Sequence, residues 1–443
     1  DLWYKAEEKL WYEGYGPTIA TDFYHRYKED IHLMKECGLN AYRTSIDWSR
    51  FIVDYEEATV DEDALAYYQD VIDAIIAEGV EPMICLEHYE LPAELFEKYG
   101  GWGSKHVVEC FVKYAKKVFE AFGSKVKYWF TFNEPIVVVE GSYLYQFYLD
   151  ALRWPYEQNT KVWMQWNYNK ILANAKVVQL YHSLRLNGKI SIILNPEMTY
   201  SRSSSPADRK AAAMFDLYYN RLYMDPCMKG IFPEELIEDL KKHHVMFDAT
   251  EEELALIRNN IIDFVGVNLY FPTRVKAPSH AWNAETPFHP DCYYEKFHLP
   301  GSQMNIDRGW EIYPKIIYDM GMRIKNEYNN MEWMITESGM GVMNETRFIG
   351  ENGEIQDDYR INFINSHLYW AMKALEDGSD CRGYLLWAFT DCVSPMNAFK
   401  NRYGLIRIDL EHNRDRSMKK SGHYFKELSK KRELMEIATD AYK

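Results

Sequence analysis

Seven short apolar segments, rich in β-branched and aromatic residues, recur along the chain, and stretches of helical periodicity lie between them. They follow one another at intervals of about 40 to 75 residues, which leaves room for a helix in each connection. Strands that alternate with helices are typical of a parallel α/β sheet, and an alternation through the whole chain favours a closed TIM (β/α)8 barrel over an open sheet. The predicted strands cover residues 41–48, 80–88, 126–134, 190–196, 264–270, 332–338 and 381–389.

A barrel of this type needs eight strands, and the sequence provides seven candidates. The first of them follows a predicted helix, so we expect the first strand of the barrel to be missing from this sequence. Residues 1–15 are too charged and irregular to supply it. No Pro/Gly/Ser linker divides the chain, which predicts one barrel domain over residues 1–443. Helices are predicted over residues 24–38, 63–79, 107–123, 166–184 and 359–377.

Composition narrows the functional class. The formal net charge of −16 argues against a general nucleic-acid or anionic-membrane binder, and no run of 18 apolar residues is present. Seven cysteines are scattered without a C-x-x-C pair, so neither a zinc site nor a disulfide framework is predicted. The adjacent His243 and His244 cannot share one helix face, and no metal site is expected from them. A cytoplasmic location is the simplest prediction.

Two of the predicted strands end in a glutamate within a similar setting, TFNEP at 131–135 and ITESG at 335–339. A barrel would bring Glu134 and Glu337 to opposite sides of one mouth. Two carboxyl groups about 5 to 5.5 Å apart suit retaining glycoside hydrolysis, with one as nucleophile and the other as proton donor. For a single strand-end glutamate, capping of the next helix is the simpler interpretation, so the surrounding motifs decide.

These motifs resemble those of glycoside hydrolase family 1, which contains β-glucosidases, β-galactosidases and their 6-phospho counterparts. TFNEP is similar to the acid/base motif of the family, and ITESG to its nucleophile motif ITENG, with Ser338 in place of the asparagine. The resemblance continues through YRTSIDWSRF at 42–51, LEHYELP at 86–92, VNLY at 267–270 and GYLLWAFTD at 383–391. It implies a single catalytic barrel that acts on a small β-glycoside without a cofactor. No nucleic-acid or membrane partner is implied, and a homo-oligomer stays possible.

The resemblance implies that Glu134 acts as general acid and then base, and that Glu337 is the nucleophile. An acid that works near neutral pH needs a pKa of about 6 to 7, and desolvation beside Trp129 and Phe130 would raise it in that direction. Arg43 and Tyr270 occupy positions from which the family holds the nucleophile's charge by ion pairing and hydrogen bonding.

Further positions match sugar ligands of the family. Asn133 is expected to donate to the sugar 2-hydroxyl, and Asn268 to orient the neighbouring carboxyl group. His88 corresponds to a ligand of the sugar hydroxyls, and Trp387 to the aromatic platform under the ring. A lone histidine is more often structural and a strand tryptophan more often belongs to the core, so these last two roles depend on the resemblance.

The segment 391–404 departs from the pattern of family members that act on plain sugars. Those members carry Glu-Trp seven residues after the stacking tryptophan, and the glutamate chelates the 4- and 6-hydroxyls. Ser394 and Pro395 stand there in this chain. Members that hydrolyse 6-phosphoglycosides have serine at this point, followed by lysine and tyrosine, because a phosphate dianion is repelled by a carboxylate and needs donors.

Ser394 and Tyr403 match two members of that phosphate-binding set. The family's Lys-Arg-Tyr reads Asn401-Arg402-Tyr403 here, with Lys400 one place earlier, so the cation could come from Lys400 or Arg402. Residues 400–420 hold seven Lys/Arg and three Asp/Glu, which would suit an anion site. An exposed basic surface is the alternative, and the charge count by itself favours that alternative.

The predicted function is a retaining 6-phospho-β-glucosidase, and its substrate a 6-phosphorylated β-glycoside. The first alternative is a β-glucosidase or β-galactosidase for unphosphorylated sugars. A catalytically weak sugar-binding relative is an alternative from another class. The missing first strand favours it, and the presence of both glutamates opposes it. Residues 271–310, with five prolines and little periodicity, are expected to form a wall of the substrate cleft.

Overall fold

The computed structural model describes residues 13–137, 160–283, 285–394 and 398–435. Pro395 and most of the segment rejected as a first strand lie outside these residues. Seven parallel strands form one curved sheet, in the order β1-β4-β5-β6-β8-β13-β15. Their bounds are Ala41–Ser45, Glu81–Cys85, Tyr128–Asn133, Lys189–Leu194, Val265–Asn268, Trp333–Glu337 and Cys381–Tyr384. Within the described residues, β1 and β15 are the edges of this sheet.

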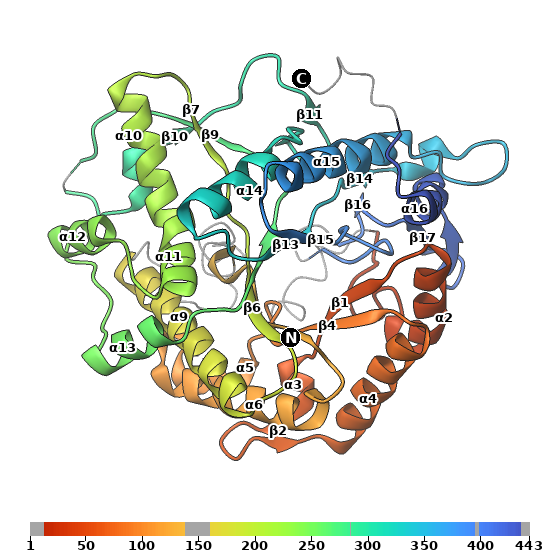
Figure 1. Cartoon of the computed structure of the whole chain (residues 1–443), viewed down its shortest axis with the longest axis horizontal. Helices are drawn as coiled ribbons and strands as arrows, with labels where there is room; N and C mark the ends of the chain where they lie inside the picture. Colours follow the sequence, from red (N-terminus) through yellow and green to blue (C-terminus); the bar gives the residue numbers. More distant parts are fainter. Residues whose placement is uncertain (1–12, 138–159, 284, 395–397, 436–443) are drawn as a thin grey trace.

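The helices surround the sheet, as Figure 1 shows in the view along the shortest axis of the molecule. This arrangement confirms the predicted (β/α)8 fold. The connecting helices are α2 (Phe23–Glu36), α4 (Glu62–Ala77), α6 (Lys105–Phe122), α9 (Thr160–Ser183), α14 (Ile316–Glu327) and α15 (Asp358–Glu376). None of the described helices is both long enough and apolar enough to cross a lipid bilayer.

Local signals explain where these helices begin. The side chain of Asp61 accepts a hydrogen bond from the backbone N–H of Ala64 and caps α4, whose first turn also carries two acidic residues. The Ser104 hydroxyl caps α6 in the same way through the N–H of His106. Helix α6 then places apolar residues on one face at helical spacing, and this face packs against α9.

The strands are shorter than predicted at their C-terminal ends. The predicted strand 381–389 ends at Tyr384, although the N–H groups of Leu385 and Trp387 still donate to the carbonyls of Ile335 and Ser338, at 2.8 and 3.0 Å. A continuous apolar run could not reveal this end, since the residues stay largely covered after the regular pairing has ended.

Strand β5 buries residues on both faces. Trp129 and Phe132 belong to the core between the sheet and the helices, whereas Phe130 packs with Met83, Cys85 and other residues in a second cluster inside the barrel. A buried parallel strand is expected to read as a continuous apolar run for this reason. The pairing with β6 shifts register between Phe130 and Asn133, which redirects the polar end of the strand.

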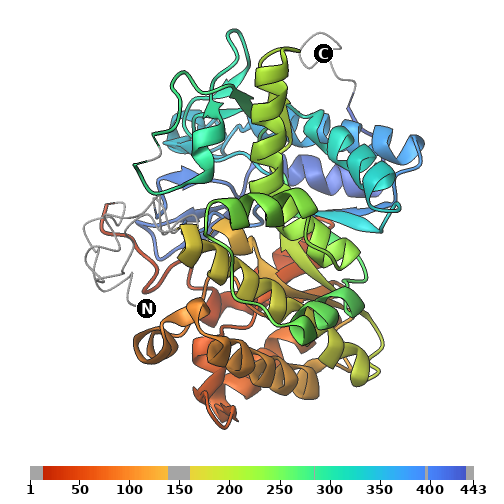
Figure 2. The same ribbon diagram turned by 90° about the vertical axis from the view of Figure 1, so that its left-hand side faces the viewer.

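Long excursions follow β6 and β8, and most of their helices and strands lie on the left-hand side of Figure 1, the side that faces the viewer in Figure 2. The excursion after β6 carries α10 (Pro206–Phe215), α11 (Leu222–Lys229), α12 (Glu234–Lys242) and α13 (Glu251–Asn259). Small sheets are formed by β7 (Thr199–Ser201), β9 (Thr273–Lys276) and β10 (Glu295–Lys296), and by the pairs β2 (Ile52–Asp54) with β3 (Thr59–Val60), β11 (Met304–Asn305) with β12 (Trp310–Glu311), β14 (Val342–Met343) with β16 (Asn401–Arg402), and β17 (Ile406–Asp409) with β18 (Asp415–Met418). The remaining helices in these connections include α3 (Trp48–Phe51), α5 (Ala93–Tyr99) and α16 (Lys420–Lys431).

Candidate active site

Glu134 and Glu337 lie at the C-terminal ends of β5 and β13, the edge at which barrels of this type place their chemistry. Glu134 has a left-handed backbone, with φ of 44°, in the turn that follows β5. Its N–H donates to the carbonyl of Ile193 at 2.9 Å, and the buried Lys170 donates to the carbonyl of Pro135 at 3.2 Å. These bonds hold a backbone conformation that is unfavourable for a residue with a side chain.

Glu337 receives hydrogen bonds at both carboxylate oxygens. The Nη2 of Arg43 donates to Oε1 and forms an ion pair, and the Tyr270 hydroxyl donates to Oε2 at 2.6 Å. The side chains of Arg43 and Glu337 are each only 6% exposed. A guanidinium and a phenol that both donate to one carboxylate stabilise its negative charge and fix its orientation, as a nucleophile requires.

Glu134 also has two donors, but its carboxyl group lies in a less favourable environment for charge. The Nδ2 of Asn268 donates to Oε1 at 2.8 Å, and the Tyr89 hydroxyl donates to Oε2 at 2.5 Å. Burial, together with repulsion from the charge of Glu337, raises the pKa of Glu134 to about 7, and the two hydrogen bonds oppose this rise. A protonated carboxyl group is therefore available near neutral pH, as a general acid requires.

Asn133 connects the surroundings of the two glutamates. Its Oδ1 accepts from Nη1 of Arg43 at 3.0 Å and from Nδ2 of Asn268 at 3.1 Å, while Thr336 fixes Asn268 through a 2.7 Å bond to its Oδ1. Its Nδ2 lies 3.2 Å from Nε2 of His88. Burial lowers the pKa of His88 to about 3, so the imidazole is neutral and Nε2 can accept from Asn133.

The structure brings seven of the predicted site residues into this one hydrogen-bonded network: Arg43, His88, Asn133, Glu134, Asn268, Tyr270 and Glu337. Trp387 lies beside it, with its ring centroid 6.0 Å from that of His88. Gly339 allows the backbone of Trp387 to lie directly against the loop after β13, because a Cβ atom at Gly339 would lie 1.8 Å from the carbonyl oxygen of Trp387. The individual roles of these residues stay predictions.

Tyr89 is a member of the network that the sequence analysis missed. It follows His88 in the loop after β4 and has a left-handed backbone, with φ of 78°. Its hydroxyl donates to Glu134. His88 was predicted from the resemblance of LEHYELP to the family. Tyr89 stands in the same segment, and its place beside a predicted ligand at the C-terminal edge of the sheet is a signal that could have marked a second donor.

Replacement of Tyr89 by phenylalanine is expected to move the basic limb of the pH profile of kcat/KM upward by about one unit. The hydroxyl stabilises the carboxylate of Glu134, so its removal raises the pKa of Glu134 further above about 7. A general acid must be protonated, and activity is lost as the pH rises through its pKa. Kinetics over pH 5 to 10 measure the shift.

Y99F is the matched control, because the Tyr99 hydroxyl donates to Glu56, which is not part of the network around Glu134. The pH profile of Y99F is expected to overlay that of the wild type. A Y89F profile with an unchanged basic limb would contradict the inferred influence of Tyr89 on Glu134.

The segment that carries the predicted phosphate ligands follows Trp387. Ser394 pairs with Ala398 through two backbone hydrogen bonds of 2.9 Å, and Lys400 is exposed. Tyr403 is only 5% exposed, and its ring packs on Gly341, where a Cβ atom would lie 2.3 Å from the ring carbon Cζ. Gly341 is thus required for Tyr403 to lie against the loop that follows the ITESG motif.

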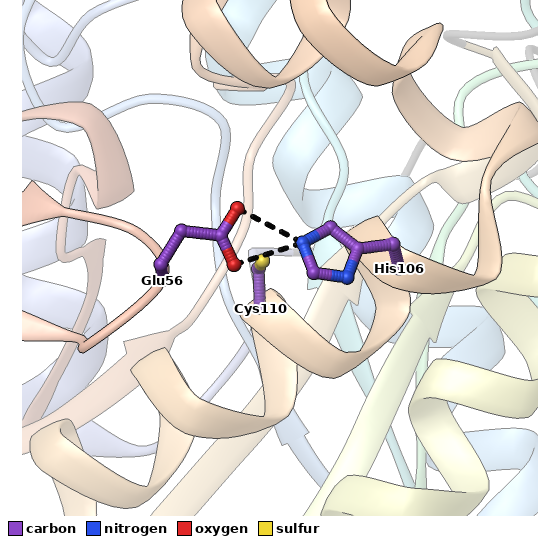
Figure 3. A group of neighbouring side chains, drawn as sticks. All are labelled: Glu56, His106 and Cys110. Atoms are coloured by element: carbon purple, nitrogen blue, oxygen red, sulfur yellow. Dashed lines mark hydrogen bonds and ion pairs between the residues drawn. The ribbon is translucent and has the colours of Figure 1, made fainter.

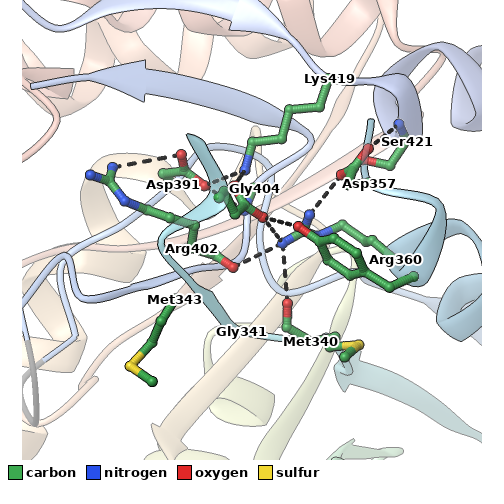
Figure 4. A network of polar contacts seen from close by, with 12 residues as sticks. Met340, Gly341, Met343, Asp357, Arg360, Asp391, Arg402, Gly404, Lys419 and Ser421 are labelled. Atoms are coloured by element: carbon green, nitrogen blue, oxygen red, sulfur yellow. Dashed lines mark hydrogen bonds and ion pairs between the residues drawn. The ribbon is translucent and has the colours of Figure 1, made fainter. Parts of the chain in front are cut away.

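A buried ion network fixes the two ends of this segment (Figure 4). The ammonium group of Lys419 donates to Asp391 at 2.7 Å and also to Glu345. Asp391 accepts in addition from the N–H of Gly404 at 3.0 Å. The side chain of Lys419 is fully buried, so these acidic partners compensate the cost of removing its charge from water.

Arg360 forms the other half of the same network (Figure 4). Its Nη1 donates to Asp357 at 2.6 Å, and its Nη2 donates to Glu345 at 2.7 Å and to the carbonyl of Arg402 at 2.8 Å. Asp357 also accepts from the N–H of Ser421 at 2.8 Å. The network ties the strand β16 to the N-terminal ends of α15 and α16.

The positive charge that the sequence indicated between 400 and 420 is largely compensated by acidic residues, most of them outside that segment. The ion pairs are Arg402 with Asp391, Arg407 with Asp409, Arg416 with Asp30, Lys419 with Glu345 and Asp391, and Lys420 with Asp358. The count of basic residues thus describes neither an open anion site nor an exposed basic surface. It reflects ion pairs that join the C-terminal segment to the rest of the barrel.

One group of three side chains in the described residues could approach a metal ion: Glu56, His106 and Cys110 (Figure 3). The carboxylate of Glu56 already accepts hydrogen bonds from Tyr99 and from His106, the latter at 2.9 and 3.0 Å. Burial raises the pKa of the Cys110 thiol, which disfavours the thiolate that a metal needs. We interpret the group as a polar contact between the turn at Glu56 and helix α6.

Two carboxyl groups held in different environments at the mouth of a parallel barrel form the arrangement that glycoside-cleaving enzymes use. The sequence model described as glycosyl hydrolase family 1 matches residues 1–434. The chain belongs to this family and is a glycosidase.

Individual relatives cover nearly the whole chain. It is 45% identical over 429 residues to the 6-phospho-beta-glucosidase GmuD of Bacillus subtilis, an alignment that spans 97% of this chain and 91% of the relative. A 6-phospho-beta-galactosidase of Clostridium acetobutylicum is 33% identical, with 99% and 97% covered. The solved structure of a beta-glucosidase from Thermotoga maritima in complex with castanospermine superposes with a TM-score of 0.85 at 28% identity and covers 98% of this chain and 93% of that chain.

Proposed function

We propose that this chain hydrolyses 6-phospho-β-glucosides with retention of configuration. The observation that supports the substrate class most directly is Ser394, which replaces the carboxylate that family members for plain sugars direct at the 6-hydroxyl. The high identity to a relative named as a 6-phospho-β-glucosidase supports the same substrate. The match of ITESG, which contains Glu337, to the nucleophile motif of the family supports the retaining mechanism.

In the first step the Glu337 carboxylate attacks the anomeric carbon, and the bond from this carbon to the leaving oxygen breaks. Glu134 transfers its proton to that oxygen, so the alcohol leaves as a neutral molecule and a glycosyl ester of Glu337 remains. Asn133 donates to the 2-hydroxyl, a contact that strengthens as positive charge develops on the ring. Arg43 and Tyr270 stabilise the charge of Glu337 before attack and after release.

In the second step water attacks the same carbon from the side that the alcohol has left. Glu134, now a carboxylate, removes a proton from this water, and the electron pair of the ester bond returns to Glu337. Each step inverts the anomeric centre, so the product retains the β configuration. Glu134 ends protonated and Glu337 ends as an anion, which restores the starting state without a cofactor.

The neutral hydroxyl of Ser394 suits a phosphate group for an electrostatic reason. A 6-phosphate carries close to two negative charges near neutral pH and presents three acceptor oxygens. A carboxylate at this place would repel it, whereas the hydroxyls of Ser394 and Tyr403 can donate to it. An unphosphorylated sugar bound to this chain would lack the bidentate contact that the glutamate at this position makes with two neighbouring hydroxyls in other family members.

Turnover of 4-nitrophenyl β-glucoside and of its 6-phosphate ester tests the proposal. We expect kcat/KM to favour the phosphate ester by at least about 100-fold, since two or more hydrogen bonds to a charged group are gained. The S394E variant is expected to lose most of this preference through repulsion, whereas S394A should lose only one donor.

A wild-type preference for the unphosphorylated glucoside would identify the chain as a plain β-glucosidase. The galactoside and its 6-phosphate, assayed in parallel, separate the gluco and galacto specificities. A correctly folded sample without turnover on any of the four substrates would favour the sugar-binding alternative.

A further inference from the structure

The hairpin formed by β11 and β12 lies beside the segment that carries the predicted phosphate ligands Lys400 and Tyr403. Its four-residue turn, 306–309, is fastened to two neighbouring segments. The Nδ2 of Asn305 donates to the carbonyl of Gly341 at 3.0 Å, and Asp307 accepts from the N–H of Met343 at 2.9 Å. The Nδ2 of Asn401 lies 3.5 Å from the carbonyl of Asp307. The turn is therefore held against β14 and β16, the strands next to Tyr403.

Arg308 in this turn is a partly buried cation that has no counter-charge among the described residues. Its guanidinium carbon lies 4.2 Å from the centroid of the Trp310 ring, and its Nε is buried without a hydrogen-bond partner. No carboxylate within the described residues forms an ion pair with Arg308. The adjacent carboxylate of Asp307 is already engaged by the N–H of Met343 and by Arg347 at 3.4 Å.

Two sets of contacts relate Arg308 to Glu337 and to the predicted phosphate ligand Tyr403. The Trp310 ring on which it stacks lies 5.3 Å from the ring of Tyr270, which donates to Glu337. Tyr403 is also close to this hairpin, because its ring packs on Gly341, whose carbonyl accepts from Asn305 at 3.0 Å. The charge of Arg308 accordingly opposes the rise that burial causes in the pKa of the Tyr403 hydroxyl. Arg308 thus lies near the predicted phosphate ligand Tyr403 and is linked to the nucleophile through two aromatic rings.

The two cations that the sequence analysis left open are less suited to this task. Lys400 is exposed. Arg402 lies 3.7 Å from Asp391, and its Nη1 donates to the carbonyl of Ile408 at 3.3 Å. Asn401 occupies the place at which the resembling family members carry lysine, and its side chain has no charge to offer. A phosphate bound between Ser394 and Tyr403 still needs a cation from some other element.

We propose that Arg308 supplies this cation and binds the 6-phosphate of the substrate together with Ser394 and Tyr403. This inference rests on the proposed function. A guanidinium matches a phosphate in shape and can donate two parallel hydrogen bonds to it. The stacking on Trp310 orients the group in advance, so less side-chain entropy is lost when the phosphate binds. An unpaired cation of this kind is unfavourable in the free enzyme. Binding of the phosphate dianion removes this cost.

The test measures kcat and KM of R308M, R308K and K400M on 4-nitrophenyl β-glucoside and its 6-phosphate. We expect R308M to lower the phosphate preference, the ratio of the two kcat/KM values, by about 100-fold. The change should come mainly from KM, because the phosphate contact is made in ground state and transition state alike. R308K keeps a point charge without the two-pronged geometry, and we expect it to recover part of the preference.

K400M separates the two candidate cations, and K420M, which removes an exposed cation paired with Asp358, is the matched control. The loss in R308M is expected to exceed that in K400M at least about tenfold. Inhibition by inorganic phosphate should weaken in R308M and persist in K420M.

An unchanged ratio in R308M, or a full loss of the preference in K400M, would overturn the assignment of Arg308 while the proposed function stands. A wild-type enzyme without phosphate preference would instead refute the proposed function, so the two failures are distinct. If R308M does not fold, R308Q and R308K give the same comparison, since both keep a polar side chain over Trp310.

Discussion

Replacement of Glu337 by glutamine is expected to lower kcat by about 10⁴- to 10⁶-fold. An amide cannot attack the anomeric carbon as a carboxylate does, and no glycosyl ester forms. Arg43 and Tyr270 keep their positions, but the charge that they stabilise is gone, and part of the Arg43 charge is left unpaired in a buried place. Pre-steady-state kinetics and intact mass after denaturation in the presence of a slow fluoro-sugar substrate measure the loss of the covalent intermediate.

Two controls define the origin of this effect. E332Q removes a carboxylate just before the N-terminal end of the same strand, where Glu332 pairs with Lys189 and Arg382, and it is expected to keep wild-type activity. E337A combined with sodium azide should regain turnover and give the glycosyl azide of inverted configuration, because azide attacks directly in the space left by the carboxylate. Full activity of E337Q, or an intermediate labelled on another residue, would contradict the assignment.

Replacement of Glu134 by glutamine is expected to lower kcat by about 10²- to 10⁴-fold, with an extent that depends on the leaving group. An alkyl or sugar leaving group needs a proton and should show the full loss. A dinitrophenyl leaving group departs without help, so the first step stays fast and the second step, which needs Glu134 as base, becomes limiting. A burst of dinitrophenol and a reduced KM are the expected signs.

The pH dependence gives a second readout for Glu134. The wild-type profile should fall as the pH rises through about 7, where Glu134 loses its proton, and E134Q should lack this limb. E81Q, at the surface end of β4 where Glu81 pairs with Lys127, is the matched control and is expected to keep the limb. An E134Q enzyme with equal losses for all leaving groups would argue against a proton-transfer role.

Periodicity identified the seven strands because a buried parallel strand is apolar on both faces and is bounded by helical stretches. Residues of β5 illustrate this, with Trp129 and Phe132 packed against the helices and Phe130 inside the barrel. The strand ends were less predictable, since the residues after Tyr384 stay largely covered after the ladder has ended. The shift of register before Asn133 likewise depends on the pairing with β6 and has no signature in β5 alone.

The residues at the site were predictable from motifs, and their partners were not. Glu134 and Glu337 stand in recognisable settings, whereas Tyr89 becomes a donor to Glu134 only through the left-handed backbone after β4. The basic residues between 400 and 420 posed the same problem. Their ion-pair partners, such as Asp30 and Asp358, lie far away in the sequence, so a local count of charge could not reveal the compensation.

The ion network around Arg360 and Lys419 has a consequence for how specificity can evolve. The acidic and basic side chains that hold the segment 391–404 pair with one another. The position of the segment therefore does not depend on the charge of the substrate. Exchange of a residue such as Ser394 or Arg308 then leaves the charge of the supporting layer unchanged. Substrate specificity can therefore change between phosphorylated and plain sugars one substitution at a time, and the barrel still folds after each substitution.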